Sequence, residues 1–273
     1  MRLAFLGPAG TFSEEAALLY APDADIVPCG TITGAAEAAL VRETDEAILP
    51  IENSLQGAVT DTLDFLIHRE GLKVKREVNL DVVHNLMAKP GTAIGDIKRV
   101  YSHPQALGQC KGYLERALPG VELAAALSTA GSVEQAMKAD VTAAAIAPQR
   151  AAALYGSELL AEGIQDDNNN VTRFIVVAAE DEGLTGSDKT SICFSFDEDK
   201  PGQLYRVMGL FADAGINLTK VESRPTRMGL GRYYFLVDLE GHRSDTSVAA
   251  VLRQVDEAAS LLKVFGSYPK FKA

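Results

Sequence analysis

Polar residues that can donate, accept or orient protons follow short apolar runs at two places in this sequence. The apolar run 47–51 leads directly into Glu-Asn-Ser at 52–54, and an amide cluster at 168–170 precedes Thr172 and Arg173. Ligands of open α/β sheets bind where strands end, so both segments are candidates for a site. Asn and Ser also cap helices and form turns, and this second interpretation stays open.

Three predicted helix starts share a further pattern, in which a hydroxyl residue is followed three positions later by Glu or Gln. Each pair fits a capping box. Several helix N-termini around one cleft would suit a small anion, and a phosphate and a carboxylate would satisfy them equally. Taken singly, each pair does no more than begin a helix. The pairs are Thr11 with Glu14, Ser102 with Gln105, and Ser132 with Gln135.

Signatures of cofactor and metal binding are lacking in the sequence. The Gly-rich run 7–14 has neither the Gly-Lys-Ser/Thr ending of a Walker loop nor the full GxGxxG spacing. The three cysteines are far apart, and no Cys or His pair has metal-ligand spacing. We therefore expect no cofactor and no metal, and a reduced, cytoplasmic protein. The apolar run 1–6 is too short for a signal sequence or a membrane span.

The composition and net charge of the chain limit the kinds of partner that it can bind. The 273 residues are 47% hydrophobic and 23% charged, which is ordinary for a globular protein. The net charge of −11 gives a field that repels nucleic acid and anionic lipid. We expect neither nucleic acid nor a membrane as a partner.

Apolar runs alternate with helix-like stretches over the first two thirds of the chain, which predicts an α/β architecture with mainly parallel strands. The expected strands are 3–6, 47–51, 78–87, 100–101, 123–127, 143–147 and 174–178, and the clearest helices are 12–21, 34–41, 59–69, 105–117 and 133–138.

An acidic, glycine-containing segment at 180–188 has the composition of an interdomain linker. The elements expected after it are strand, helix, two strands, helix and strand, which is the βαββαβ order of a ferredoxin-like domain. Their ranges are 190–196, 202–214, 217–223, 232–240 and 246–260, with the last strand near Val264.

Four motifs, in this order and spacing, resemble those of the prephenate dehydratases, and the resemblance covers essentially the whole chain. The second domain resembles the ACT regulatory domain of that family, with Gly202-Gln203-Leu204-Tyr205 and Glu222-Ser223-Arg224-Pro225 at its two effector motifs. The four motifs are Gly7-Pro8-x-Gly10-Thr11-Phe12-Ser13, Pro50-Ile51-Glu52-Asn53-Ser54, Ser102-His103-Pro104-Gln105 and Asn170-x-Thr172-Arg173-Phe174.

The resemblance implies a two-lobed catalytic domain, similar to a periplasmic binding protein, over residues 1–179. One lobe would comprise roughly 1–75 and 155–179, and the other 76–154. A linker at 180–188 would lead to an ACT domain at 189–273. A homodimer or homotetramer is expected, because a lone βαββαβ unit exposes sheet edges and one face. The length predicts no fused chorismate mutase domain.

The resemblance also implies roles for individual residues. Thr172 would be catalytic, as a donor to the departing hydroxyl, with Asn53 binding substrate and Glu52 relaying a proton or orienting a neighbour. Ser102 and Gln109 lie at helical spacing along one face, whereas His103 and Gln105 are more readily structural. The implied substrate-binding residues are Thr11, Ser13, Ser54, Ser102, Gln109, Asn170, Arg173 and Phe174.

The implied activity is conversion of prephenate to phenylpyruvate, water and CO2, with feedback inhibition by phenylalanine. The first effector motif usually reads Gly-Ala-Leu-Val, so Gln203 and Tyr205 are departures that predict a retuned or altered effector preference. Arg224 is expected to pair with Glu222. Two alternatives stay open, an arogenate dehydratase and a non-catalytic amino-acid sensor. The implied effector residues are Gly202, Leu204, Asn217, Leu218, Glu222, Ser223 and Arg224.

Overall fold

The computed structural model describes residues 1–198, 200–226 and 231–271. Contacts divide the chain into two compact units. The first unit comprises Met1–Thr62 and Val78–Phe174, and the second comprises Leu63–Glu77 and Ile175–Ala273.

The first sheet has the strand order β2 (Asp25–Cys29), β1 (Arg2–Leu6), β3 (Glu46–Asn53), β11 (Val171–Ala178) and β5 (Lys73–Asp81). The short β4 (Gly57–Ala58) pairs with β3. Strand β1 is parallel to both β2 and β3. Continuous apolar runs form β1 and β3 because both faces of these strands are buried. The helices α1 (Phe12–Tyr20), α2 (Ile32–Leu40) and α3 (Thr60–His68) follow β1, β2 and β4.

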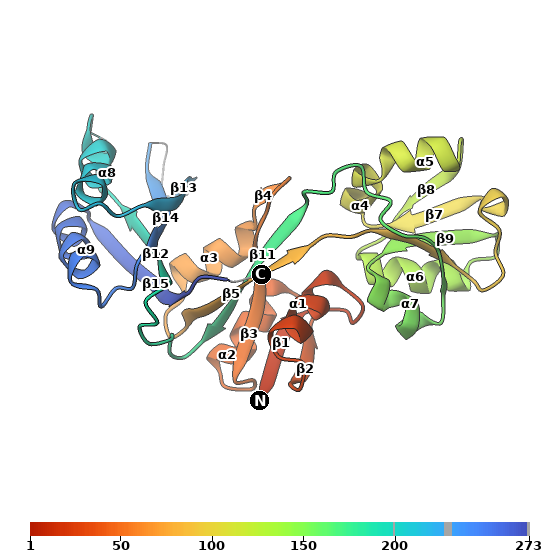
Figure 1. Ribbon diagram of the computed structural model, residues 1–273, viewed down its shortest axis with the longest axis horizontal. Coiled ribbons are helices and arrows are strands. Elements are labelled where there is room, and N and C mark those ends of the chain that lie inside the picture. The colour runs from red at the N-terminus through yellow and green to blue at the C-terminus, as the bar shows by residue number, and fades with distance from the viewer. Residues whose placement is uncertain (199, 227–230, 272–273) are drawn as a thin grey trace. The chain divides into compact units, whose positions relative to one another are not determined.

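The second sheet lies within the first unit and has the order β10 (Glu158–Ala161), β6 (Asn85–Ala88), β9 (Ala143–Ala147), β7 (Arg99–Ser102) and β8 (Glu122–Ala125). In Figure 1, α4 (Pro104–Gln109) and α5 (Lys111–Ala117) lie on one side of it and α6 (Thr129–Lys138) and α7 (Gln149–Tyr155) on the other. Alternate residues of β9 belong to two hydrophobic cores, one on each face of this sheet. Ile146 packs with α4 and α5, and Ala145 packs with α6 and α7.

The strands differ from the sequence-based prediction in several ways. The expected strand 78–87 is two strands, since residues 82–84 separate β5 from β6. The pairing of β6 with β9 and β10 is antiparallel, so the domain is a mixed α/β structure. Strand β5 belongs to the first sheet through Asp81, and β10 to the second. The expected lobe limits at 75/76 and 154/155 therefore do not follow the sheets.

Two of the predicted helix starts are wrong, and the third is altered. His103 and Ser128 cap α4 and α6, in place of Ser102 and Ser132. Thr11 does stand at the N-cap of α1, but its hydroxyl contacts the carbonyl oxygen of Pro8 and accepts no hydrogen bond from the helix. The expected helix 105–117 is broken at Cys110 into α4 and α5.

The second unit contains the predicted βαββαβ order. Its antiparallel sheet has the order β13 (Leu218–Pro225), β14 (Tyr233–Glu240), β12 (Asp188–Ser195) and β15 (Leu261–Pro269). The helices α8 (Gln203–Asp213) and α9 (Thr246–Ala258) pack their apolar residues against this sheet in one core. The ferredoxin-like topology is thus confirmed.

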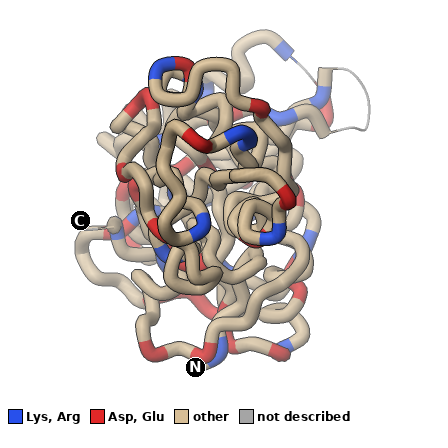
Figure 2. The backbone as a smooth tube through the Cα atoms, turned by 90° about the vertical axis from the view of Figure 1, so that its right-hand side faces the viewer, with Lys and Arg blue, Asp and Glu red and all other residues tan. Residues whose placement is uncertain are grey.

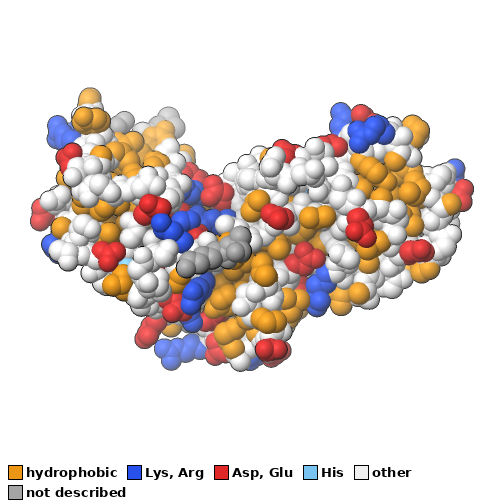
Figure 3. All heavy atoms as spheres, viewed as in Figure 1, with side chains coloured by type: hydrophobic (Ala, Val, Ile, Leu, Met, Phe, Trp, Pro, Cys, Tyr) orange, Lys and Arg blue, Asp and Glu red, His pale blue; other side chains and the backbone are white. Residues whose placement is uncertain are grey.

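Charged residues of both signs are interspersed along the chain (Figure 2), and their side chains are interspersed over the face drawn in Figure 3. Within the described part of the chain, no helix is long and apolar enough to cross a bilayer. Cys29, Cys110 and Cys193 are free thiols, and burial raises the pKa of Cys110 and of Cys193 to about 12.

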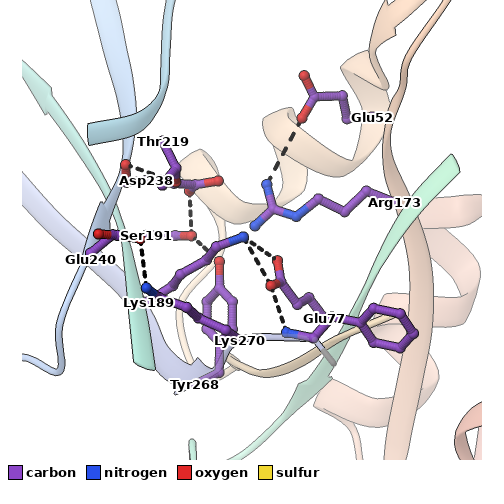
Figure 4. A network of polar contacts seen from close by, with 11 residues as sticks. Glu52, Glu77, Arg173, Lys189, Ser191, Thr219, Asp238, Glu240, Tyr268 and Lys270 are labelled. Atoms are coloured by element: carbon purple, nitrogen blue, oxygen red, sulfur yellow. Dashed lines mark hydrogen bonds and ion pairs between the residues drawn. The ribbon is translucent and has the colours of Figure 1, made fainter. Parts of the chain in front are cut away.

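Residues 63–77 are bonded to the C-terminal sheet within the second unit. Lys189 pairs with the carboxylate of Glu77 at 2.9 Å (Figure 4), and Lys263 donates to the carbonyl oxygen of Ile67 at 3.1 Å. The closest backbone approach is at Gly266 of β15. A Cβ added there would lie 2.2 Å from the carbonyl oxygen of Val74 and 2.8 Å from its nitrogen.

We predict that Gly266→Ala lowers the free energy of unfolding by about 1–3 kcal/mol, because the new methyl group meets backbone atoms that cannot rotate away. Urea unfolding measures this. Gly209→Ala, in the middle of α8 with open space around its Cβ, is the matched control. It should raise stability by about 0.5–1 kcal/mol, since Ala is the better helix former. A Gly266→Ala midpoint at or above that of the wild type would contradict the packing described.

Candidate functional site

A cavity of about 670 Å³ lies in the first unit. Loops after β1, β3 and β8, the start of α4, and strand β11 supply most of its wall. Of the predicted site residues, Thr11, Ser13, Asn53, Gln109, Thr172 and Phe174 line it; further lining residues include Phe12, Pro50, Gln56, Val82, His84, His103, Gln105, Leu127, Ser128 and Thr129.

Strand alternation separates the predicted residues of β3 and β11 into two sets. Asn53 on β3 and Thr172 on β11 line the cavity. Their neighbours Glu52 and Arg173 point to the opposite face, because successive side chains of a strand alternate. There the carboxylate of Glu52 and the guanidinium of Arg173 lie 3.9 Å apart (Figure 4). The structure therefore places Glu52, predicted to be catalytic, and Arg173, predicted to bind substrate, outside the cavity.

The side-chain amide of Asn53 has a defined orientation. Its Oδ1 accepts hydrogen bonds from the main-chain N–H groups of Leu55 and Gln56, both at 3.1 Å. A main-chain N–H can only donate, so the atom facing it must be the oxygen. The Nδ2 group is left to donate to Oδ1 of Asn170 at 2.7 Å and to Oγ1 of Thr172 at 2.9 Å.

The hydroxyl of Thr172 is consequently an acceptor toward Asn53. Asn53 Nδ2 supplies that hydrogen bond, so the proton of Thr172 Oγ1 is not used in it. Thr172 borders the cavity, where a ligand can receive the proton as a hydrogen bond. The arrangement makes Thr172 an oriented neutral donor.

The same network continues through Asn170, which is 1% exposed. Its Oδ1 accepts from Asn53, so its Nδ2 is the group that donates to Oε1 of Gln109 at 3.1 Å. Nε2 of His84 lies 2.8 Å from the same oxygen. Asn170 thus forms hydrogen bonds with two residues of the cavity wall, Asn53 and Gln109, and is not itself among the lining residues.

His84 is a site residue that the sequence analysis missed. Residues 78–87 were expected to form one strand, whereas His84 lies in the break between β5 and β6. Burial lowers the pKa of His84, and its hydrogen bond with Gln109 offsets part of that shift. A lowered pKa favours the neutral imidazole at pH 7. No spacing pattern in the sequence around His84 predicts that it lies at the cavity, since the break between β5 and β6 depends on how these strands pair.

Two predicted serines have structural roles. Ser102 is fully buried, and its hydroxyl donates to the carbonyl oxygen of Ile146 at 2.6 Å. Ser54 accepts from the N–H of Val171 at 2.9 Å and donates to the carbonyl oxygen of Asn169 at 3.0 Å. Neither is among the residues that line the cavity. Ser54 joins the ends of β3 and β11, and so supports Asn53 and Thr172 indirectly.

The Gly-rich turn beside the cavity is held by a buried carboxylate. Glu14, 3% exposed, accepts from the N–H of Gly10 at 2.6 Å and from Arg150 of α7 at 3.0 Å. Burial raises the pKa of Glu14, but the hydrogen bonds from Arg150 and Gly10 outweigh it and lower the pKa below its usual value. Gly10 has a φ of 85°, and an added Cβ would lie 3.3 Å from Cα of Ala151. This close approach explains the glycine in the motif.

His103 and Gln105 also line the cavity, although the sequence analysis gave them structural roles. Nδ1 of His103 accepts from the N–H of Gln105 at 3.3 Å, which caps α4. Among the described residues, no group of three or more His, Cys, Asp and Glu side chains is placed to hold a metal ion.

A second cavity, of about 300 Å³, lies in the second unit. Of the predicted effector residues, Gly202 and Leu204 line it, whereas Asn217, Leu218, Glu222, Ser223 and Arg224 do not. The two departures from the family motif, Gln203 and Tyr205, are part of its wall. Further lining residues are Phe196, Glu198, Lys200, Pro201, Gly231, Tyr233 and Phe235.

The predicted pairing of Arg224 with Glu222 is wrong. Arg224 donates to Oδ2 of Asp64 on α3 at 2.8 Å, and Glu222 pairs with Lys220 at 3.2 Å. Residues two apart on a strand share a face, but a carboxylate on the adjacent α3 competes better for the guanidinium.

Comparisons with known proteins agree with this architecture. Residues 3–182 match the sequence model of prephenate dehydratase, and residues 198–257 match that of the ACT domain. The chain is 40% identical over 271 residues to a bifunctional chorismate mutase/prephenate dehydratase of Aquifex aeolicus strain VF5, in an alignment that covers 99% of this chain and 74% of the relative.

Two further relatives extend the comparison. The chloroplastic arogenate dehydratase/prephenate dehydratase 2 of Arabidopsis thaliana is 41% identical over 281 residues, covering 98% of this chain and 73% of the relative. The solved structure of a prephenate dehydratase from Arthrobacter aurescens in complex with L-Phe has a TM-score of 0.91 and 38% identity, covering 99% and 90% of the two chains. The family model alone matches more than half of the residues. This chain belongs to the prephenate dehydratase family.

Proposed function

We propose that this chain is a lyase of phenylalanine biosynthesis that converts prephenate to phenylpyruvate, water and CO2. Family membership identifies the reaction. The observation in the structure that supports it most directly is the hydrogen bond from Asn53 to Thr172, which leaves the hydroxyl proton of Thr172 available at the cavity wall.

The reaction needs a donor at one point. The bond between the ring and its carboxylate breaks, and CO2 leaves. The electron pair moves into the ring as the C–O bond breaks on the opposite side, and the departing hydroxide takes up a proton from solvent and becomes water. A hydrogen bond from Thr172 to that oxygen stabilises the negative charge that develops on it. Formation of the aromatic ring drives the step, so the protein mainly orients the substrate and supports the leaving group.

The substrate carries two carboxylates, and helix N-termini can bind them. The starts of α1, at Thr11 and Ser13, and of α6, at Ser128 and Thr129, line the cavity. Helix N-termini present main-chain N–H groups and a positive dipole end. Arg173, which the sequence analysis listed as substrate-binding, pairs with Glu52 outside the cavity, so these N-termini are proposed to bind the carboxylates in its place. Glu52 is accordingly proposed to orient Arg173 and not to relay a proton.

Arogenate is the second candidate substrate, and differs only in bearing an amine in place of the keto group. The Arabidopsis relative is named for both activities. Comparison of kcat/KM for prephenate and arogenate on the purified chain tests the preference. A chain that turned over neither would overturn the enzymatic reading in favour of an amino-acid sensor.

We predict that Thr172→Ala lowers kcat on prephenate by about 10²–10³, the usual cost of removing one oriented donor to a developing charge. Thr172→Ser keeps the hydroxyl and should retain much more activity. The matched control is Thr60→Ala, at the start of α3 and outside the lining residues, which should leave kcat within about twofold of the wild type. Equal activity of Thr172→Ala and the wild type would rule out the role given to Thr172.

Phenylalanine is proposed to inhibit the enzyme by binding at the cavity of the second unit. Gly202 has a φ of 84° and immediately precedes α8, so main-chain N–H groups at the start of this helix can bind the effector carboxylate. Phe196, Tyr233 and Phe235 supply apolar surface for an aromatic ring. Gln203 and Tyr205 reshape the entrance, since Tyr205 is 81% exposed.

Assembly and location are proposed on simpler grounds. Strand β13 is an edge of its sheet, and its residue Val221 is 53% exposed. Pairing of two copies there would cover such an edge in a homodimer or homotetramer, and Asn217 and Leu218 would then reach the effector of the neighbouring subunit. Three free thiols suit the reducing cytoplasm.

The ion pair between Arg224 and Asp64 provides a route from the effector motif toward the catalytic cavity. Arg224 follows Glu222 and Ser223 in the second effector motif, and Asp64 lies on α3. The same helix carries Thr62, whose hydroxyl donates at 2.6 Å to the carbonyl oxygen of Pro50, a residue of the cavity wall. A shift of Arg224 would therefore be transmitted along α3.

We predict that Asp64→Asn raises the phenylalanine concentration for half-inhibition about two- to fivefold, the value of a partly exposed ion pair. The activity without phenylalanine should change by less than about twofold, because Asp64 is not among the residues that line the cavity. Asp61→Asn, an exposed carboxylate on the same helix, is the matched control in inhibition assays. Identical inhibition curves for the two variants would show that the ion pair does not transmit the effect.

A further inference from the structure

Two polar atoms at the cavity wall are buried without a hydrogen-bond partner among the described residues, namely Nε2 of Gln109 and Nδ1 of His84. An unsatisfied buried polar atom costs about 1–3 kcal/mol, so it calls for a reason. The two residues contact each other, since Nε2 of His84 lies 2.8 Å from Oε1 of Gln109. For Nε2 of Gln109, the direction of this hydrogen bond provides that reason.

The direction follows from the amides already described. Asn170 Nδ2 donates to Oε1 of Gln109, so this oxygen is an acceptor and cannot give a proton to His84. Nε2 of His84 must therefore carry the proton and donate it. Burial keeps the ring neutral, because it lowers the pKa of His84. The imidazole is accordingly the Nε2–H tautomer, with Nδ1 unprotonated.

His84 is itself held firmly. Its main-chain N–H donates to Oε1 of Gln165 at 3.0 Å, and its carbonyl oxygen accepts from the N–H of Ile164 at 2.9 Å. The ring of Phe12 stands edge-on to the imidazole, with centroids 5.4 Å apart. At 2% exposure, the side chain has little freedom to move. A donor held in this way defines the position of the group that it binds.

We propose that His84 is a positioning residue for the dehydration: it holds the amide oxygen of Gln109, so that the amide –NH2 of Gln109 is the group that binds prephenate. Oε1 of Gln109 accepts hydrogen bonds from both Asn170 and His84. If the amide of Gln109 were turned by 180°, its –NH2 group would face the N–H groups of both residues, and both hydrogen bonds would be lost. The substrate then supplies the acceptor that Gln109 Nε2 lacks. The proposal rests on the proposed function and assigns to it a residue that acts through another.

Two substitutions of His84, whose side chains differ in length, test this role. Gln at position 84 can place an amide N–H near the position of Nε2, whereas the shorter Asn cannot reach Gln109. Both side chains are polar and uncharged, so they share the cost of burial. We expect His84→Asn to raise KM for prephenate about tenfold with kcat changed less than about threefold, and His84→Gln to stay within about threefold of the wild type in both.

The decisive comparison repeats His84→Asn in a Gln109→Ala background. If His84 acts through Gln109, the tenfold change in KM should shrink to less than about threefold there. A tenfold change that persists, or a His84→Asn enzyme with the wild-type KM, would overturn the role of His84 alone. If His84→Asn does not fold, His84→Gln decides, since a tenfold rise in its KM would also overturn the role. A wild-type chain inactive on prephenate would instead overturn the proposed function.

Discussion

Two hydrogen bonds from the main-chain N–H groups of Leu55 and Gln56 to Oδ1 of Asn53 determine the direction of the hydrogen bonds along the wall of the cavity in the first unit. Because a main-chain N–H cannot accept, Asn53 must turn its –NH2 toward Asn170 and Thr172. Every later direction in the network follows from this one, through Asn170 to Gln109 and His84. Neutral groups are thereby given the directed character that catalysis requires, without a charge buried in the cavity wall.

The same network joins motifs that lie far apart in the sequence. Asn53 stands at the end of β3 and Thr172 near the start of β11, strands that are neighbours in the sheet but more than 100 residues apart in the sequence. Ser54 joins the two strand ends through the N–H of Val171 and the carbonyl oxygen of Asn169. The polar side chains at the two strand ends are thus held by main-chain groups of the adjoining turns, at Leu55, Gln56 and Asn169, and by the N–H of Val171 on β11.

The sequence predicted the parts that depend on local pattern. The βαββαβ order follows from periodicity and is confirmed, and the two domain types implied by the resemblance are matched by the family models. Asn53 and Thr172, singled out by the same resemblance, line the cavity. Glu52 and Arg173 could have been separated from Asn53 and Thr172 by strand alternation alone. Ser102 and His84 could not be assigned in this way. The burial of Ser102 depends on the pairing of β7 with β9, and the exposure of His84 to the cavity depends on the break after β5.

The central claim is that Asn53 orients Thr172 by donating to it, and kcat of the nearly isosteric Asn53→Asp enzyme on prephenate at pH 8 tests it most directly. An ionised carboxylate keeps the acceptor for Leu55 and Gln56 but removes the donor, so Thr172 would give its proton to residue 53 and not to the substrate. Asn53→Asp is predicted to lose about 10²–10³ in kcat. The loss in kcat of Asn53→Asp should match that of Thr172→Ala. The urea midpoint of the second unit should be unchanged. A kcat within threefold of the wild type would contradict the account.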